Sequence, residues 1–186
     1  MKQKEQYVLI AFLVLPFLLF GRSSSTQLHI MNVVNTLQRH PSLRYRTRSK
    51  NTITQVVLHH SGGSTGSPER YARQHVEDNG WPGIGYHFVI QPEGKVFQTN
   101  EITTISYHAT NCNTIGIGIC LTGNFNETNP TLAQLRSLKT LIRTIENDVG
   151  RKLNIVGHRD CKNTSCPGHN FDVAAFAVDY RNTVGW

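Results

Sequence analysis

The sequence of 186 residues contains no internal repeat and no low-complexity block, and only 17% of its residues are charged. Hydrophobic residues make up 38%, which is ordinary for a globular protein and argues against disorder over the whole chain. A chain of this length can form one domain with a sizeable core, together with extensions. We therefore expect a single globular domain.

Long apolar runs are confined to the N-terminus. Residues 7–21 are almost purely apolar, but this run is shorter than the about 20 residues that a membrane-spanning helix needs. Two lysines precede the run, and Ser23 and Ser25 supply small residues for cleavage after Ser25. This pattern is typical of a secretory signal over residues 1–25, with an uncleaved membrane anchor as the alternative. Both interpretations predict an exported protein, secreted or periplasmic.

Acidic residues are absent between Glu5 and Glu69, whereas the formal net charge of the chain is +7. Five basic residues are concentrated in one short stretch: Arg39, Arg44, Arg46, Arg48 and Lys50. We interpret residues 26–52 as a basic linker of modest structure. Such a tract can associate electrostatically with an anionic cell wall or membrane, and a merely solvated linker is the alternative. Nucleic acid is not expected as a partner, because the protein is predicted to be exported.

The sequence has only four cysteines, namely Cys112, Cys120, Cys161 and Cys166. In an oxidising compartment an even number of cysteines favours disulfides, so that two bridges are conceivable. If Cys166 instead binds a metal, at most one bridge can form. The sequence does not select its two partners.

Strand and helix signals alternate in the rest of the chain. The β-branched, apolar run ITQVVLHH predicts a buried strand, and Ser67 followed by Pro68 predicts the start of a helix. An apolar stripe beginning after Asn129-Pro130 predicts a long helix that ends at Gly150. Further elements are expected as strands on both sides of the turn at 92–94, over 115–120 and over 153–156, and as a helix from about 172. The alternation predicts a mixed α/β domain over residues 53–186.

One face of the predicted strand over 115–120 is nearly bare of side chains. Gly116, Gly118 and Cys120 alternate there with three isoleucines. Glycine on a strand face lets another backbone, a helix or a ligand approach closely. We therefore expect something to pack directly against this strand.

Metal-ligating residues occur at two places that are distant in the sequence. His59 and His60 end the first predicted strand, and His158 is followed eight residues later by Cys166, directly before the turn residues Pro167-Gly168. Neighbours on a strand point to opposite faces, so one of the two strand-end histidines should bind. Imidazole and thiolate are ligands that Zn²⁺ prefers, and three protein ligands leave a position for water, as in catalytic zinc sites.

Several motifs together make this sequence similar to a known family. VVLHHSGG, GYHF, SYHATNCNTIGIGICLTGNF and GHRD with SCPG and FD occur in the same order as in the type 2 zinc N-acetylmuramoyl-L-alanine amidases. That family includes a phage lysozyme and the animal peptidoglycan recognition proteins. The similarity extends from residue 53 to about residue 175.

The resemblance implies a single α/β domain with a central mixed β-sheet flanked by helices. It implies hydrolysis of the amide between N-acetylmuramic acid and L-alanine in peptidoglycan or muropeptides, with one Zn²⁺ per chain bound by His59, His158 and Cys166. We expect a monomer. A non-catalytic peptidoglycan-binding protein on the same fold is the alternative, although retention of all three ligands argues against it. A zinc peptidase that cuts within the stem peptide is a third hypothesis.

The resemblance also suggests catalytic roles. Tyr86 matches a tyrosine that is catalytic in part of the family, and it could orient water or stabilise the developing oxyanion. Thr164 stands where the phage enzyme has a lysine, and Cys120 where another branch has a glutamate base. His108 is a candidate substrate-binding residue that could line the cleft or bond the reacting carbonyl, with a structural role as the alternative. His87 is expected to be structural.

One acidic residue, Asp160, lies close to the predicted ligand His158 in the sequence. Its carboxylate could orient a ligand imidazole. Pairing with Arg159 or with a helix end is an equally good interpretation.

Overall fold

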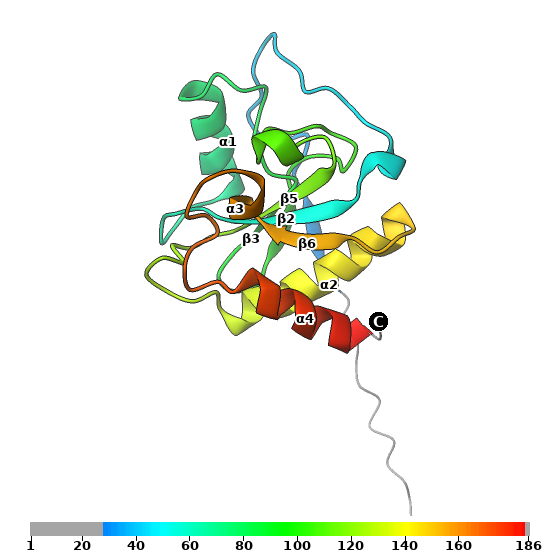
Figure 1. Ribbon diagram of the computed structural model, residues 1–186. Coiled ribbons are helices and arrows are strands. Elements are labelled where there is room, and N and C mark those ends of the chain that lie inside the picture. Colours follow the sequence, from blue (N-terminus) through cyan, green and yellow to red (C-terminus); the bar gives the residue numbers. More distant parts are fainter. Residues whose placement is uncertain (1–27, 185–186) are drawn as a thin grey trace, which may run out of the picture.

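A six-stranded sheet forms the centre of the computed structural model, which describes residues 28–184 (Figure 1). The strands lie in the order β1-β4-β3-β5-β2-β6. Their bounds are β1 Ile30–Asn32, β2 Gln55–His60, β3 Phe88–Ile90, β4 Val96–Gln98, β5 Gly116–Leu121 and β6 Asn154–Gly157. Within the described chain, β3 and β4 pair antiparallel and the other neighbours pair parallel. The predicted mixed α/β domain is therefore confirmed.

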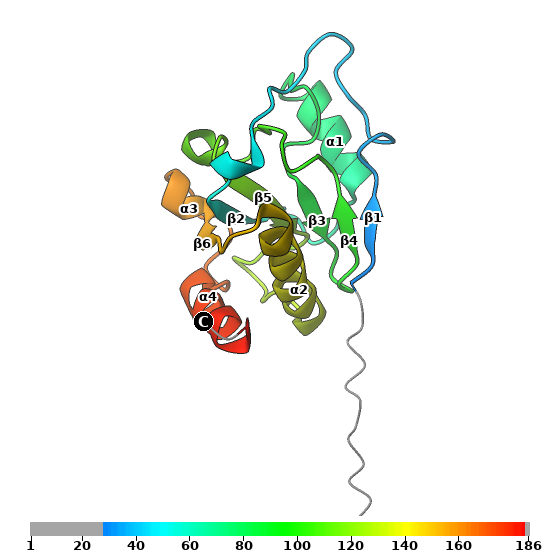
Figure 2. The same ribbon diagram turned by 90° about the vertical axis from the view of Figure 1, so that its right-hand side faces the viewer.

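Helices cover both faces of the sheet. The long helix α2 (Leu132–Val149) and the last helix α4 (Val173–Val184) pack on one face, where they bury the larger apolar cluster (Figures 1 and 2). Helix α1 (Pro68–Glu77) packs on the other face, as do the short helix α3 (His158–Cys161) and the 3-10 turn η2 (Thr110–Cys112). Side chains of successive strand residues alternate between these two layers.

The ends of the main helices follow from their capping residues. The Ser67 hydroxyl accepts a hydrogen bond from the backbone N–H of Arg70 at the start of α1. Thr131 and Gln134 form a reciprocal capping box at the start of α2. Gly150 ends α2 with a left-handed φ of 75°. The predicted helices are thus confirmed to within a few residues.

The segment before residue 53 belongs to the domain, so its interpretation as a linker is wrong for the described residues from 28 onward. Strand β1 pairs with β4 at the edge of the sheet, with Ile30 opposite Val96. Leu37 is buried in the cluster beneath α1. The segment shows no apolar periodicity, because a three-residue edge strand and an irregular stretch bury single side chains rather than a repeating stripe.

The basic tract is also largely structural rather than a free tether. The Arg39 guanidinium donates to Asn100 Oδ1 at 2.7 Å and to the Thr99 carbonyl at 2.9 Å. Lys50 forms an ion pair of 2.6 Å with Asp148 on α2. Arg48 is buried, and its burial lowers the pKa of the guanidinium to about 10. Arg39 and Arg48 thus hold neighbouring elements, whereas the Lys50 side chain contacts α2 but is still 45% exposed.

Arg48 supports two loops at once. Its guanidinium donates to the carbonyls of Asn113 at 2.7 Å, Thr114 at 2.9 Å and Ile102 at 2.9 Å. Buried carbonyls that lose their donor carry a desolvation penalty. The loop before β5 therefore depends on a residue outside the predicted domain.

We expect Arg48→Met to lower the free energy of unfolding by about 3 kcal/mol, because one buried and two part-buried carbonyls lose a charged donor. Urea denaturation followed by circular dichroism measures the change. Arg46→Met is the matched control, since Arg46 is exposed and a surface change of this kind has an effect within about 0.5 kcal/mol. Equal effects of the two substitutions would contradict a structural role for Arg48.

No helix between residues 28 and 184 combines the length and the apolar character that crossing a membrane requires. The predicted signal over residues 1–25 lies outside the described residues.

Candidate metal centre

Two of the predicted ligands are brought together by strand register. Strands β2 and β6 are parallel neighbours, and Leu58 pairs with Gly157. The residues that follow, His59 and His158, therefore emerge side by side at the same edge of the sheet, with ring centroids 4.6 Å apart. Carboxyl ends of parallel strands are where open α/β sheets carry their functional groups.

Cys166 reaches the same point on a loop that returns after α3. The loop contains a cis peptide bond before Pro167, and Gly168 adopts a φ of 106°. A Cβ atom at position 168 would collide with the backbone of Phe125, so this turn requires glycine. Cys166 Sγ lies 3.7 Å from His59 Nδ1 and accepts a hydrogen bond from the His60 backbone N–H at 3.4 Å.

The three side chains fit a metal ion such as zinc. One ligand atom from each of His59, His158 and Cys166 lies within 4.8 Å of the others. His158 Nε2 is buried and has no hydrogen-bond partner among the described residues, as expected of an atom whose partner is a metal. One sulfur and two imidazole donors suit Zn²⁺.

The two imidazoles are in the protonation state that a cation needs, whereas the thiol is not. Burial lowers the pKa of His59 and of His158, so both imidazoles are neutral at neutral pH and offer a lone pair. Burial raises the pKa of the Cys166 thiol to about 11. A metal would therefore displace the thiol proton when it binds.

His60, the other strand-end histidine, has a different role. Its Nδ1 accepts a hydrogen bond of 3.0 Å from the backbone N–H of Phe125, and its ring packs against that phenylalanine. The side chain thus holds the loop that also contacts Gly168. Only His59 of the pair belongs to the cluster, as the alternation of strand side chains predicts.

The cluster lies in a pocket of about 250 Å³. Tyr86 and Thr164 line this pocket, together with three residues that sequence reasoning missed: His75, Trp81 and Tyr107. Ring contacts connect His75 to Trp81 and Trp81 to Tyr107. The spacing of these three residues in the sequence does not indicate a binding site. The one hint was that Trp81 lies five residues before the candidate catalytic residue Tyr86.

Tyr86 lies beside the candidate ligands. Its ring centroid is 5.3 Å from that of His59. Burial, reinforced by the neighbouring thiols of Cys120 and Cys166, raises the pKa of its phenol well above the usual value. Tyr86 therefore keeps its proton and is a hydrogen-bond donor; its neighbour in the protein is the Cys120 thiol, and its side chain also lines the pocket.

Three residues discussed from the sequence accept hydrogen bonds from the backbone. Thr164 lines the pocket, and its hydroxyl also accepts a hydrogen bond of 3.3 Å from the Cys166 backbone N–H. Asp160 accepts from the Gly157 N–H at 2.8 Å and so caps α3, which matches the helix-end interpretation. His87 is buried, and its Nδ1 accepts from the Gly118 N–H at 2.9 Å, which fits the structural role expected for it.

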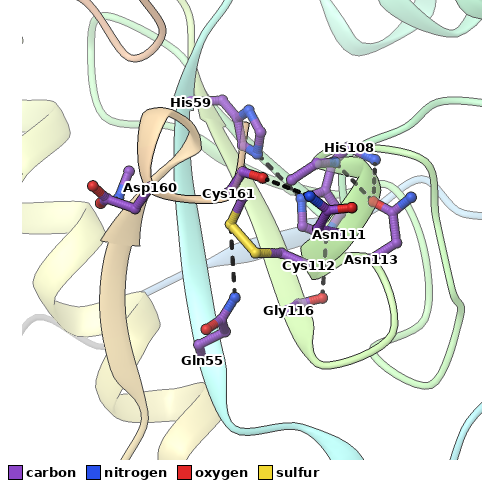
Figure 3. The surroundings of a disulfide bond; sticks show 11 residues. Gln55, His59, His108, Asn111, Cys112, Asn113, Gly116, Asp160 and Cys161 are labelled. Carbon is purple, nitrogen blue, oxygen red and sulfur yellow. Dashed lines mark hydrogen bonds between the residues drawn. A yellow bond between two sulfur atoms is a disulfide. The ribbon is translucent and has the colours of Figure 1, made fainter. Parts of the chain in front are cut away.

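His108 occupies the bare face of β5. A Cβ atom at Gly118 would lie 2.6 Å from His108 Cγ, so the glycine makes room for the ring. His108 Nδ1 is 3.2 Å from His59 Nε2, and His108 Nε2 is 3.2 Å from the Gly116 carbonyl (Figure 3). His108 lines the pocket as expected, but both of its ring nitrogens are engaged within the protein and not free for a substrate carbonyl.

A disulfide connects the two sides of the centre. Cys112 in η2 is bonded to Cys161 at the end of α3, as Figure 3 shows. The Asn111 side chain donates to the Cys161 carbonyl at 3.2 Å beside it. All four cysteines lie within the described residues, and Cys120 and Cys166 are not bridged. The bridge therefore ties the loop that carries His108 to the helix that begins with His158.

Comparison with known proteins agrees with this geometry. Peptidoglycan-recognition protein SC2 of Drosophila melanogaster is 30% identical over 135 residues, which cover 67% of this chain and 73% of that protein. N-acetylmuramoyl-L-alanine amidase LysC from Clostridium intestinale is 29% identical, with a TM-score of 0.68 over 81% of this chain and 96% of that one.

A third match shares the fold at lower identity. Peptidoglycan recognition protein-LE in complex with tracheal cytotoxin is 21% identical, with a TM-score of 0.68 over 82% of this chain and 92% of that one. The family model of N-acetylmuramoyl-L-alanine amidases, Amidase_2, matches residues 49–169. The chain therefore belongs to the family of type 2 N-acetylmuramoyl-L-alanine amidases and peptidoglycan recognition proteins.

Proposed function

We propose that the protein is a zinc-dependent hydrolase that cleaves the amide between N-acetylmuramic acid and L-alanine in peptidoglycan. The observation that carries this proposal is the cluster of His59, His158 and Cys166, with one buried and unpartnered imidazole nitrogen, at the wall of an open pocket. Export, predicted from residues 1–25, would bring the protein to this extracytoplasmic substrate.

His59, His158 and Cys166 would hold the zinc ion, which when bound would supply Lewis acidity toward a carbonyl oxygen and a water molecule. The chain's own contribution is the arrangement of donors around the pocket. Tyr86, which keeps its phenolic proton, would donate a hydrogen bond to the substrate oxygen that gains negative charge. The Thr164 hydroxyl, which also lines the pocket, offers a second donor.

The wall of the pocket supports a saccharide-peptide substrate. Trp81 and Tyr107 present aromatic surface next to the candidate metal centre, and Tyr107 is 40% exposed. Aromatic rings with one polar end suit a ligand that is partly apolar and partly hydrated. The related recognition protein-LE was solved in complex with tracheal cytotoxin, a monomeric diaminopimelic acid-type peptidoglycan, which supports muropeptide as the ligand class.

Digestion of purified muropeptides, followed by mass spectrometry of the products, tests the proposal. We expect free stem peptides that begin with L-alanine, no products after treatment with a chelator, and recovery when zinc is added back. Products cut within the stem would instead identify a peptidase. Binding of muropeptide without turnover, with or without zinc, would identify a recognition protein. This is the alternative function, and relatives such as peptidoglycan-recognition protein SC2 carry it in their names.

A further inference from the structure

We infer that His108 is a positioning residue that selects the tautomer of His59, so that His59 Nδ1 carries the lone pair facing the candidate metal centre. The inference rests on the proposed metal role of His59. His108 then acts on the candidate metal-ligating residue His59 and not on the substrate.

The first step follows from the Gly116 carbonyl. A carbonyl oxygen can only accept a hydrogen bond, so His108 Nε2, at 3.2 Å from it, carries the proton. In a neutral imidazole the other nitrogen is then an acceptor. His108 Nδ1 therefore accepts from whichever group lies opposite.

The group opposite is His59. Its Nε2 lies 3.2 Å from His108 Nδ1 and must supply the proton of that hydrogen bond. The neutral His59 ring consequently has its lone pair on Nδ1, the atom that lies 3.7 Å from Cys166 Sγ. A backbone carbonyl of β5 thus determines, through two imidazole rings, which nitrogen of His59 is available (Figure 3).

The loop that carries His108 is held at several points. The Asn113 side-chain oxygen accepts from the backbone N–H groups of His108 at 3.0 Å and Ala109 at 2.7 Å. The carbonyl of Asn113 accepts from buried Arg48, and the disulfide at Cys112 anchors the following turn.

Within this turn Thr110 has a φ of 36°, which is unfavourable for a β-branched residue. Surrounding contacts must therefore maintain the conformation. The same contacts place the His108 ring over the glycine face of β5, against His59.

Because of the contact with His108, the His59 side chain already has its lone pair on the nitrogen that would bind the metal. Without an acceptor at His59 Nε2, the ring can place its proton on Nδ1 or rotate, and both changes oppose metal binding. Loss of a group that orients a metal-bound histidine typically weakens metal affinity by about 10–100-fold.

Two substitutions separate this role from simple packing. In His108→Asn the side-chain oxygen can occupy the place of Nδ1 and accept from His59, whereas His108→Leu fills the space without an acceptor. We expect His108→Leu to bind zinc about 10–100-fold more weakly in competition with a chromogenic chelator, and His108→Asn to retain most of the wild-type affinity. Wild-type affinity in the leucine variant would overturn the inference.

Long-range ¹H–¹⁵N correlation spectra of the metal-free wild-type protein give a second, independent measurement. We expect both His59 and His108 to carry their ring proton on Nε2. A His59 ring protonated at Nδ1 would overturn the inference even if the leucine variant failed to fold. A protein with the expected tautomers and zinc affinity but no turnover of muropeptide would refute the proposed function and leave this inference intact.

Discussion

Replacement of Cys166 by serine is expected to remove zinc from the purified protein and to abolish measurable amidase activity. Serine is a poor ligand at neutral pH, because its hydroxyl does not ionise as the thiol does when a metal binds. Structural zinc sites with four ligands bind with about 10–16 kcal/mol, or roughly 3 kcal/mol for each ligand. Losing one of three ligands should therefore weaken zinc binding by about 10²–10³-fold, measured as metal content after dialysis and as affinity in chelator competition.

Cys120→Ala is the matched control for that experiment. Cys120 is also unbridged and is fully buried, but it lies outside the cluster of His59, His158 and Cys166. The alanine variant should keep one zinc per chain. Stoichiometric zinc in the Cys166→Ser protein would show that the ligands lie elsewhere.

Tyr86→Phe is expected to lower kcat by about 10²–10³-fold, the usual effect of losing one donor to a developing oxyanion. The phenylalanine ring can keep the packing against His59, so zinc content should remain unchanged. The loss should appear in kcat more than in KM, because the proposed hydrogen bond strengthens only in the transition state. Thr164→Ala should lose less, since Tyr86 would remain as the main donor to the oxyanion.

Tyr71→Phe provides the comparison for Tyr86→Phe. The Tyr71 ring lies 6.5 Å from that of Tyr86, and its hydroxyl pairs with Thr122 at 3.0 Å beneath α1. Its loss should reduce stability by about 1 kcal/mol and leave kcat nearly unchanged. A fully active Tyr86→Phe enzyme would remove the tyrosine from the mechanism.

Elements with strong local signals could be predicted from the sequence. Strand β2 and helix α2 have clear apolar patterns. The capping residue Ser67 marks the start of helix α1 at the residue level. Strand β1 could not be predicted in this way, because its three residues gain their stability from pairing with β4, which lies far away in the sequence. Arg48 was misread for the same reason, since its partners are carbonyls of distant loops.

The candidate site could likewise be predicted only in part from the sequence. Residue type and spacing indicated His158 and Cys166, and the resemblance selected His59 over His60. The contact between His59 and His108 depends on the register of β2 with β5 and on the space left by Gly118. The strand register and the space at Gly118 cannot be read from a single sequence. The sequence therefore suggested that His108 faces the substrate, whereas its ring contacts His59.

The bridge between Cys112 and Cys161 joins residues 49 positions apart, and the chain between them includes β5, α2 and β6. In the chain-entropy view, closing a loop of this size restricts the unfolded ensemble by roughly 4 kcal/mol at room temperature. A newly made chain with reduced thiols lacks that contribution. If residues 1–25 direct export as the sequence predicts, oxidation after export would add this stability in the compartment of the proposed substrate. Before export, the reduced chain would be easier to unfold for transport across a membrane.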